Sequence, residues 1–274
     1  MHTAARSAPS DAPLLRRDLR ADGVLTLTLA RPQARNALSI AMLEALGGAF
    51  AEIAADREVR AVVLAADGPA FSSGHDLKEI TAARAGADGG RAFFEDTLAR
   101  CAAMMQQVVA LPQPVIAAVE GIASAAGCQL VATCDLAIAG DRAQFCTPGV
   151  NIGLFCSTPM VALSRNLSRK HAMEMLLSGD MFDADEAARF GLVNRVVEAG
   201  GALDAALALA GRIASKSALT VKIGKRAFYE QAEMKLGQAY DYASRVMVEN
   251  LLARDADEGI SAFVQKRTPN WEDR

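Results

Sequence analysis

Short apolar runs that alternate with helical segments are the feature that most constrains the fold of this chain. Four such runs are predicted strands: residues 23–30 (GVLTLTLA), 60–66 (RAVVLAA), 114–119 (PVIAAV) and 136–139 (LAIA). Three helices are predicted in the same part of the chain: residues 39–55, 90–111 and 125–133. Strands that alternate with helices are typical of parallel βαβ units, so the chain is predicted to belong to the α/β class.

Local signals set the ends of several elements. Pro32 ends the first strand, because proline cannot continue a ladder of hydrogen bonds. Ser39 is predicted to cap the first helix, and Asp183 with Glu186 fits a capping box at the start of a later one. Gly191 is predicted to end that later helix.

From Thr158 onward the pattern is almost entirely helical. The last predicted helices cover residues 202–215, 219–254 with a break near Leu236-Gly237, and 256–266. Three parts are therefore predicted: a disordered tail (1–15), an α/β core (16–200) and a helical C-terminal region (201–274).

The composition excludes several classes of partner. The net charge is −3, so nothing favours nucleic acid or an anionic membrane. No apolar stretch approaches the ~20 residues that span a bilayer. Residues 1–15 show no secretory signal pattern, and a transit peptide is the alternative to a disordered tail. We expect a cytoplasmic protein, or one of the mitochondrial matrix if the source is eukaryotic.

The cysteine spacing predicts neither a disulfide framework nor a metal site. The chain has five cysteines, and none forms a CxxC pair. Free cysteine usually behaves as a small buried hydrophobe, and we expect that here.

Two segments rich in glycine, serine and alanine could bind an anion through the backbone. The first is 71–76 (FSSGHD), and the second is 121–127 (GIASAAG), which runs into a predicted helix. Unpaired amide groups at a helix N-terminus could hold the oxyanion that forms when a thioester carbonyl is attacked or enolised. Tight packing alone also explains such a junction, so both interpretations stay open.

Several motifs in one order resemble the crotonase family, also called the enoyl-CoA hydratase/isomerase family. They are RPQARNAL, FSSGHDL, PVIAAVEGIASAAGCQLVATCDLAIAGDRAQFCTPGVNIG and AMEMLLSGDMFDADEAARFGLVNRVV. The resemblance runs from about residue 22 to the C-terminus. It implies a crotonase-like spiral of ββα/βαβ units with a helical C-terminal trimerisation region. It also implies a homotrimer or hexamer that acts on acyl-CoA thioesters in fatty acid metabolism, with coenzyme A as part of the substrate and no separate cofactor.

The resemblance also assigns residues. It implies that the backbone N–H groups of His75 and Ala126 are the oxyanion donors. The residues implied to bind the substrate or coenzyme A are Gln33, Ala34, Arg35, Ser73, Gly74, Asp76, Leu77, Ala123, Ser157 and Lys266. Lys266 matches a basic residue that reaches the coenzyme A phosphates, sometimes from a neighbouring subunit. Solvated surface charge is the alternative interpretation for Arg35 and Lys266.

The chain departs from the family pattern where a hydratase carries its two carboxylates. Those positions are Gln129 and Gly149 here. A hydratase needs a base to activate water and an acid to protonate the α-carbon. An amide exchanges no proton at neutral pH, and glycine has no side chain. Ordinary hydration is therefore not expected.

His75 is the predicted substitute, because an imidazole titrates in the useful pH range. The alternative is a neutral histidine that only shapes the acyl pocket. Three functions stay open. The first is an acyl-CoA enzyme of altered chemistry, either an isomerase, a thioester hydrolase or a decarboxylase. The second is a weak hydratase, and the third is a non-catalytic thioester binder.

Overall fold

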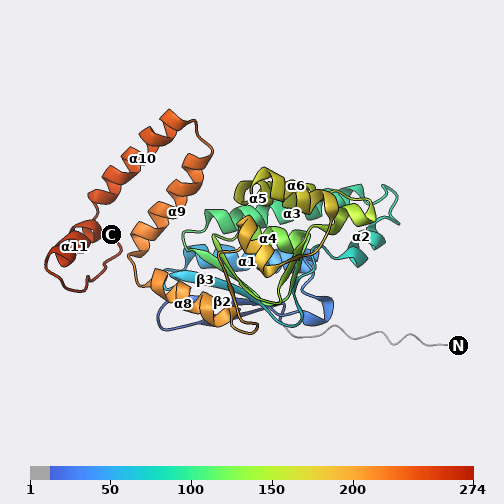
Figure 1. The fold of residues 1–274 in the computed structure, drawn as a ribbon, viewed down its shortest axis with the longest axis horizontal. Helices are drawn as coiled ribbons and strands as arrows, with labels where there is room; N and C mark the ends of the chain where they lie inside the picture. Colours follow the sequence, from blue (N-terminus) through green and yellow to red (C-terminus); the bar gives the residue numbers. More distant parts are fainter. Residues whose placement is uncertain (1–12) are drawn as a thin grey trace.

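The computed structural model describes residues 13–274, which form two sheets with helices packed around them (Figure 1). Most of the predicted disordered tail, residues 1–12, lies outside the described residues. Leu15, its last predicted residue, begins strand β1 (Leu15–Leu19) and pairs with Leu29. The predicted tail was therefore too long at its C-terminal end.

The larger sheet has six strands in the order β1-β2-β3-β5-β7-β10. After β1 these are β2 (Val24–Leu29), β3 (Ala61–Ala66), β5 (Val115–Val119), β7 (Leu136–Gly140) and β10 (Arg195–Val197). All neighbours pair in parallel except β1 and β2. The four predicted strands are thus confirmed as β2, β3, β5 and β7.

A second, smaller sheet was not predicted. Its order is β4-β6-β8-β9, from β4 (Ala70–Ser72), β6 (Ile122–Ser124), β8 (Gln144–Cys146) and β9 (Phe182–Asp183). The strands have two or three residues, which is too short for an alternating pattern to be recognised. Parts of the two segments interpreted as loops are therefore strands. The pairs β3–β4, β5–β6 and β7–β8 each supply one strand to each sheet, so the chain winds as a spiral of ββα units.

Seven helices before residue 200 pack around these sheets. They are α1 (Ile40–Ala55), α2 (Leu77–Ala83), α3 (Arg91–Ala110), α4 (Ala126–Thr133), α5 (Ser157–Asn166), α6 (Arg169–Ser178) and α7 (Ala184–Phe190). The predicted caps are confirmed: Ser39 accepts from the Met42 N–H, and Asp183 and Glu186 form a capping box. Helix α2 was not predicted.

The central strands of the larger sheet are buried on both faces. Along β3, Val62 and Leu64 point into the main core, whereas Ala61 and Val63 point into a second cluster beneath α8 (Ala202–Ala214). Helix α8 presents Ala202, Ala206, Ala210 and Ala214 to this face, one residue per helical turn. Small side chains let the helix lie close to the sheet.

The remaining helices form an arm that extends from the sheets (Figure 1). We use the term arm for α9 (Ala218–Ala232), α10 (Leu236–Leu251), α11 (Arg254–Val264) and residues 265–274. The predicted break near Leu236 is confirmed. Among residues 13–274, no helix combines the length and apolarity needed to cross a membrane.

A buried ion pair attaches the arm to the sheets. Lys225 Nζ on α9 lies 2.7 Å from Asp135 Oδ2, and it also donates to the carbonyl oxygens of Val108 and Gln113. The Tyr229 hydroxyl donates to the other Asp135 oxygen at 2.9 Å. Burial lowers the pKa of Lys225 below its usual value, against the opposing effect of Asp135.

Candidate functional site

The two predicted anion-binding segments meet at Gly74 and Ala126. Gly74 has φ +84°, and a Cβ atom there would lie 3.1 Å from the Ala126 nitrogen and 3.0 Å from the Ser124 carbonyl oxygen. Only glycine allows both this backbone conformation and this approach. The loop after β4 therefore lies directly against the N-terminus of α4.

A second glycine brings the same elements together. A Cβ atom on Gly127 would lie 2.3 Å from the Ser72 carbonyl oxygen, closer than atoms can approach. The first turn of α4 is therefore pressed onto the end of β4, and the tight packing expected of such a junction is present here.

The structure places two unpaired N–H groups at this contact. Ala126 is the first residue of α4, so its N–H has no acceptor within the helix. Within residues 13–274, neither the Ala126 N–H nor the His75 N–H donates to a protein acceptor. Ala125 holds the turn at φ 49°, with its N–H bonded to the Cys146 carbonyl oxygen and its own carbonyl oxygen accepting from Gln129. A strained non-glycine residue of this kind often marks a functional site.

Asn36 organises the neighbouring loop, and sequence reasoning missed it. Its buried Nδ2 donates to the carbonyl oxygens of Asp67 and Ala70, and its Oδ1 accepts from the Arg31 N–H. The Ser72 hydroxyl donates to the Asn36 carbonyl oxygen at 2.8 Å. An asparagine in a short turn, here at φ 49°, was the available signal.

Residues 33–35 lie next to this loop. Gln33 and Ala34 lie in a 3₁₀ turn (Pro32–Ala34), and Arg35 ends it in the left-handed region. The Ser73 N–H donates to the Arg35 carbonyl oxygen at 3.0 Å. The structure thus brings Arg35, one of the residues implied to bind the substrate or coenzyme A, beside the 71–76 segment.

The His75 imidazole is partly buried and lies beside the backbone of Leu38. Its Nδ1 is 3.4 Å from the Leu38 carbonyl oxygen, whereas its buried Nε2 has no partner among residues 13–274. Burial lowers the pKa of His75 below its usual value, against the raising effects of Leu38 and Glu79. A lowered pKa favours the neutral form of the imidazole at pH 7.

Gln129 lies on the same face of α4 as Ala126, three residues further along. Its side chain is 5% exposed, and its Oε1 has no hydrogen-bond partner among the described residues. A buried amide oxygen without a partner costs roughly 1–3 kcal/mol. This arrangement suits a ligand that supplies a polar group.

Gly149 lies in a 3₁₀ turn (Pro148–Ile152) whose surroundings leave no room for a side chain. A Cβ atom there would lie 2.9 Å from Cys156 Sγ and 2.7 Å from the Leu154 carbonyl oxygen. Cys156 immediately precedes α5 and is buried. Burial raises the pKa of its thiol, while a hydrogen bond with the Gly149 backbone lowers it by less.

The other predicted residues differ in position. Asp76 caps α2 by accepting from the Lys78 N–H at 2.8 Å, and Leu77 is exposed. Ala123 is fully buried in β6, and Ser157 is exposed at the start of α5. Lys266 follows α11, at the end of the molecule opposite α2, so within one chain it does not join the other residues (Figure 1).

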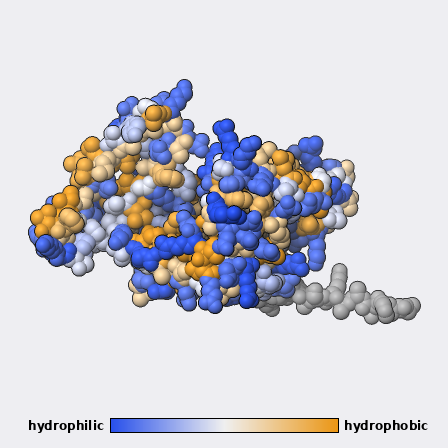
Figure 2. All heavy atoms as spheres, in the orientation of Figure 1, coloured by the Kyte–Doolittle hydropathy of each residue, from blue (hydrophilic) through white to orange (hydrophobic). Residues whose placement is uncertain are grey.

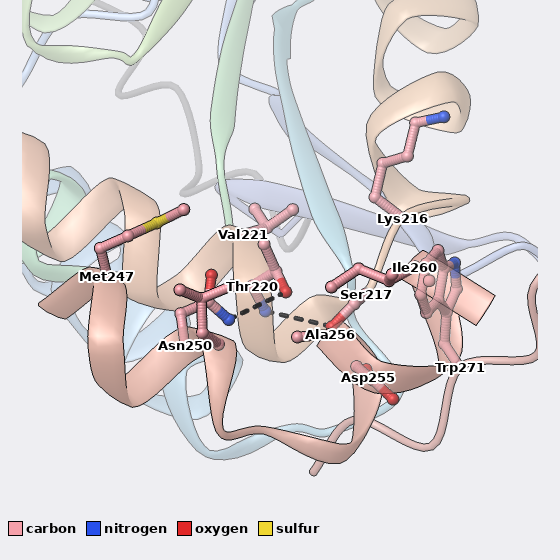
Figure 3. A pocket seen from close by; sticks show the side chains of 12 residues that line it. Lys216, Ser217, Thr220, Val221, Met247, Asn250, Asp255, Ala256, Ile260 and Trp271 are labelled. Carbon is pink, nitrogen blue, oxygen red and sulfur yellow. Dashed lines mark hydrogen bonds between the residues drawn. The ribbon is translucent and has the colours of Figure 1, made fainter. Parts of the chain in front are cut away.

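A groove of about 490 Å³ lies in the arm, away from these loops (Figure 3). It is bounded by α9, α10 and α11, and Val221, Met247, Ile260 and Trp271 contribute apolar side chains to it. No group of three or more potential metal ligands occurs in residues 13–274.

A sequence profile described as enoyl-CoA hydratase/isomerase matches residues 20–274. The chain belongs to the enoyl-CoA hydratase/isomerase family. The predicted resemblance and the predicted crotonase-like fold are confirmed.

Similar proteins agree with this membership. Enoyl-CoA hydratase domain-containing protein 3, mitochondrial, of Rattus norvegicus is 44% identical over 269 residues, which cover 98% of this chain and 88% of the relative. The protein of that name in Homo sapiens is 46% identical over 250 residues, which cover 91% of this chain and 81% of the human protein. This branch of the family is the one that the motifs GHDLKEI and AAGCQLVATCD indicated.

Solved structures of the family superpose closely. An enoyl-CoA hydratase of Mycobacterium smegmatis gives a TM-score of 0.91 at 52% identity, over 95% of this chain and 99% of that one. Human enoyl-CoA hydratase domain-containing protein 3 gives a TM-score of 0.89 at 44% identity, over 94% of this chain and 100% of that one.

Proposed function

We propose that this chain binds an acyl thioester of coenzyme A with the thioester oxygen between the N–H groups of His75 and Ala126. Any turnover then uses groups other than the paired carboxylates of a hydratase. The observation that carries this proposal is the approach of Gly74 to Ala126, which brings two unpaired N–H groups to one place.

Two such donors favour a definite kind of chemistry. They stabilise negative charge on a thioester oxygen, whether it arises by removal of an α-proton or by attack on the carbonyl. Removing one donor from such a pair typically slows a reaction by about 10²–10³-fold. Isomerisation, thioester hydrolysis and decarboxylation all pass through an oxyanion of this type.

The side chains near the donors argue against ordinary hydration. Gln129 can orient a water molecule or a polar acyl group but cannot exchange a proton at neutral pH. Position 149 offers no side chain, and its surroundings are filled. General acid and base groups contribute about 10²–10⁴-fold each, so a hydratase without both is expected to be weak.

His75 is the proposed base. Its Nε2 is unpaired and neutral at pH 7, and its own backbone N–H is one of the two proposed donors. One residue would then bind the oxyanion and accept the α-proton. A second candidate function, a non-catalytic thioester binder, follows if the imidazole only shapes the pocket.

Exposed apolar side chains support a homotrimer or hexamer. The arm exposes Leu236, Leu252 and Phe263 at 75%, 77% and 85%, and Figure 2 shows hydrophobic surface across it. Helices α5 and α6 expose a second set that includes Val161, Met173 and Leu177. Large exposed apolar patches mark interaction sites. We propose that the two patches meet between subunits and that Lys266 then reaches coenzyme A phosphates of a neighbour.

The proposed location is the cytoplasm, or the mitochondrial matrix in a eukaryotic source. The names of the rat and human relatives place those proteins in mitochondria.

The test combines a binding titration with absorbance measurements of crotonyl-CoA and of a longer trans-2-enoyl-CoA. Turnover that survives Gln129→Ala but disappears in His75→Ala supports the histidine as base. Tight binding without turnover of any acyl chain supports the non-catalytic binder. Absence of binding to either thioester overturns the proposal.

A further inference from the structure

A lysine follows the last helix in a backbone conformation that usually belongs to glycine. Lys266 comes after the C-cap of α11 with φ +55°, in the left-handed region. Its N–H donates to the Phe263 carbonyl oxygen at 3.2 Å, and the Arg267 N–H donates to the Ala262 carbonyl oxygen at 3.0 Å. This pair of hydrogen bonds is the Schellman motif, in which the left-handed residue is usually glycine. A Cβ atom is unfavourable in that conformation, so Lys266 strains the end of the helix.

Two other helices of this chain end on glycine instead. Gly179 ends α6 at φ +66°, and Gly191 ends α7 at φ +91°. Among residues 13–274, the residues other than glycine that have positive φ are Arg35, Asn36, Ala125, Lys266 and Asp273. Arg35, Asn36 and Ala125 lie at the candidate site. Strain of this kind persists where surrounding contacts enforce it, and it gathers at functional sites.

The contacts around Lys266 enforce the turn. Glu258, which is 8% exposed, holds the Arg267 guanidinium through both oxygens, with Oε1 2.6 Å from Nη1 and Oε2 2.8 Å from Nη2. Glu258 Oε1 also accepts the Asn270 N–H at 2.8 Å. The backbone and the side chain of Arg267 are therefore both bound, directly after Lys266.

The chain beyond this turn is fastened as well. The Trp271 Nε1–H donates to the Ser215 carbonyl oxygen at 3.0 Å, and the Trp271 ring lines the groove of the arm (Figure 3). Asp273 Oδ2 lies 2.9 Å from Nη1 of Arg60, which immediately precedes β3. Lys266 therefore lies between α11 and a segment that is bound to the junction of α8 and α9.

The side chain that this turn presents carries a charge without a partner. Lys266 is exposed, and its ammonium group belongs to none of the ion pairs within residues 13–274. Arg35, the other cation held at positive φ, is exposed and has no ion pair in that part of the chain either. A fixed backbone reduces the conformational freedom that such a cation loses when it binds an anion.

We propose that Glu258 and Arg267 are positioning residues, which hold Lys266 in its left-handed conformation and thereby present its ammonium group to the phosphate groups of coenzyme A. This inference rests on the proposed function, in which Lys266 reaches the coenzyme A of a neighbouring subunit. The end of α11 gives up stability so that one cation is held ready for an anion.

The test compares crotonyl-CoA with crotonyl-pantetheine, which has the same thioester and no phosphate group, by titration calorimetry of the full chain. Lys266→Met should weaken binding of crotonyl-CoA by up to about fivefold at low ionic strength and should leave crotonyl-pantetheine binding unchanged. Glu258→Gln and Arg267→Lys each remove the two-point ion pair, so each should weaken only crotonyl-CoA, by about twofold. With Lys266→Met already present, Glu258→Gln should cause no further loss.

Urea unfolding measures the strain directly. Lys266→Gly should raise the urea midpoint above those of wild type and Lys266→Met, because only glycine removes the Cβ atom. Lys222→Gly, inside α9, is the matched control and should lower the midpoint. A Lys266→Gly midpoint at or below that of wild type would mean that the turn is unstrained, and it overturns the inference.

The binding data can also overturn it. Glu258→Gln that weakens both ligands equally has a purely structural effect, and unchanged crotonyl-CoA binding by Lys266→Met means that no phosphate is contacted. Either result overturns this inference and leaves the proposed thioester site standing. Failure of the wild type to bind crotonyl-CoA overturns the proposed function itself.

Discussion

The backbone of Gly74 lies against the N–H of Ala126 so closely that a Cβ atom on Gly74 would come within 3.1 Å of that nitrogen. The relationship joins the end of β4 to the start of α4, two elements separated by about fifty residues. It determines the distance between the two proposed oxyanion donors.

Gly74→Ala should therefore impair thioester binding and turnover more than its cost in stability suggests. The substitution strains a backbone at φ +84° by roughly 1–2 kcal/mol and pushes the loop from Ala126. We expect any measured turnover of crotonyl-CoA to fall by about 10²-fold. The control is Gly48→Ala, in an exposed part of α1 with no atom within 4 Å of the new Cβ. Equal effects of the two substitutions would contradict the prediction.

Gln129→Leu should stabilise the protein while weakening its function. The change removes a buried amide oxygen without a partner, so the free energy of unfolding should rise by about 1–2 kcal/mol. Gln113→Leu is the contrasting variant. The Gln113 Oε1 is also unpartnered, but its Nε2 donates to the Ile53 and Asp56 carbonyl oxygens, and the loss of these two hydrogen bonds should destabilise the protein. Urea unfolding of both variants measures whether the free energy of unfolding rises or falls. A destabilised Gln129→Leu variant would show that the amide has a partner in solution.

Reinstating a carboxylate at position 149 should not restore hydration. Gly149→Ala alone places a Cβ atom 2.7 Å from the Leu154 carbonyl oxygen, and overpacking of this kind costs about 1–3 kcal/mol. Combining it with Cys156→Ala should recover only part of that loss, because the backbone oxygen remains. We expect the Gln129→Glu, Gly149→Glu variant to hydrate crotonyl-CoA no faster than wild type. Rapid hydration by that variant would mean that the 149–156 loop rearranges easily.

Lys225→Met should destabilise by roughly 3–5 kcal/mol, because it leaves the buried Asp135 carboxylate without its cation. Lys222→Met, on an exposed face of the same helix, is the matched control and should have little effect. Thermal unfolding compares the two. Adding Asp135→Asn to Lys225→Met should recover part of the loss, since the unpaired charge is then absent.

His75 should make stability sensitive to acid. Because its folded pKa lies below 6.5, the unfolded chain binds the proton more tightly. Its contribution to stability is fully present above pH 6.5 and is lost as pH falls through the lowered pKa, at a slope of at most about 1.4 kcal/mol per pH unit. Urea unfolding between pH 5 and pH 7.5 should show a shallower fall for His75→Gln than for wild type.

Much of the fold could be predicted because its signals are local. Strand β2 has an alternating pattern, strands β3, β5 and β7 are continuous apolar runs, and the caps at Ser39 and Asp183 depend on neighbours within three residues. The short strands of the second sheet lacked such a signal. Ala70–Ser72 pairs with Ile122–Ser124, which in turn pairs with β8, and no short window of the sequence contains these partners.

The sequence by itself determined the family, the order of the long strands and helices, and the replacement of the two family carboxylates by Gln129 and Gly149. Each of these can be recognised from adjacent residues or from motifs in a fixed order. Only the tertiary structure decided that Gly74 touches Ala126, that Asn36 supports this loop, and that Cys156 fills the space beside Gly149. These contacts join residues that are separated along the chain or that are brought together by the conformation of a loop. They depend on how closely backbones approach, and local propensity and spacing do not report such distances.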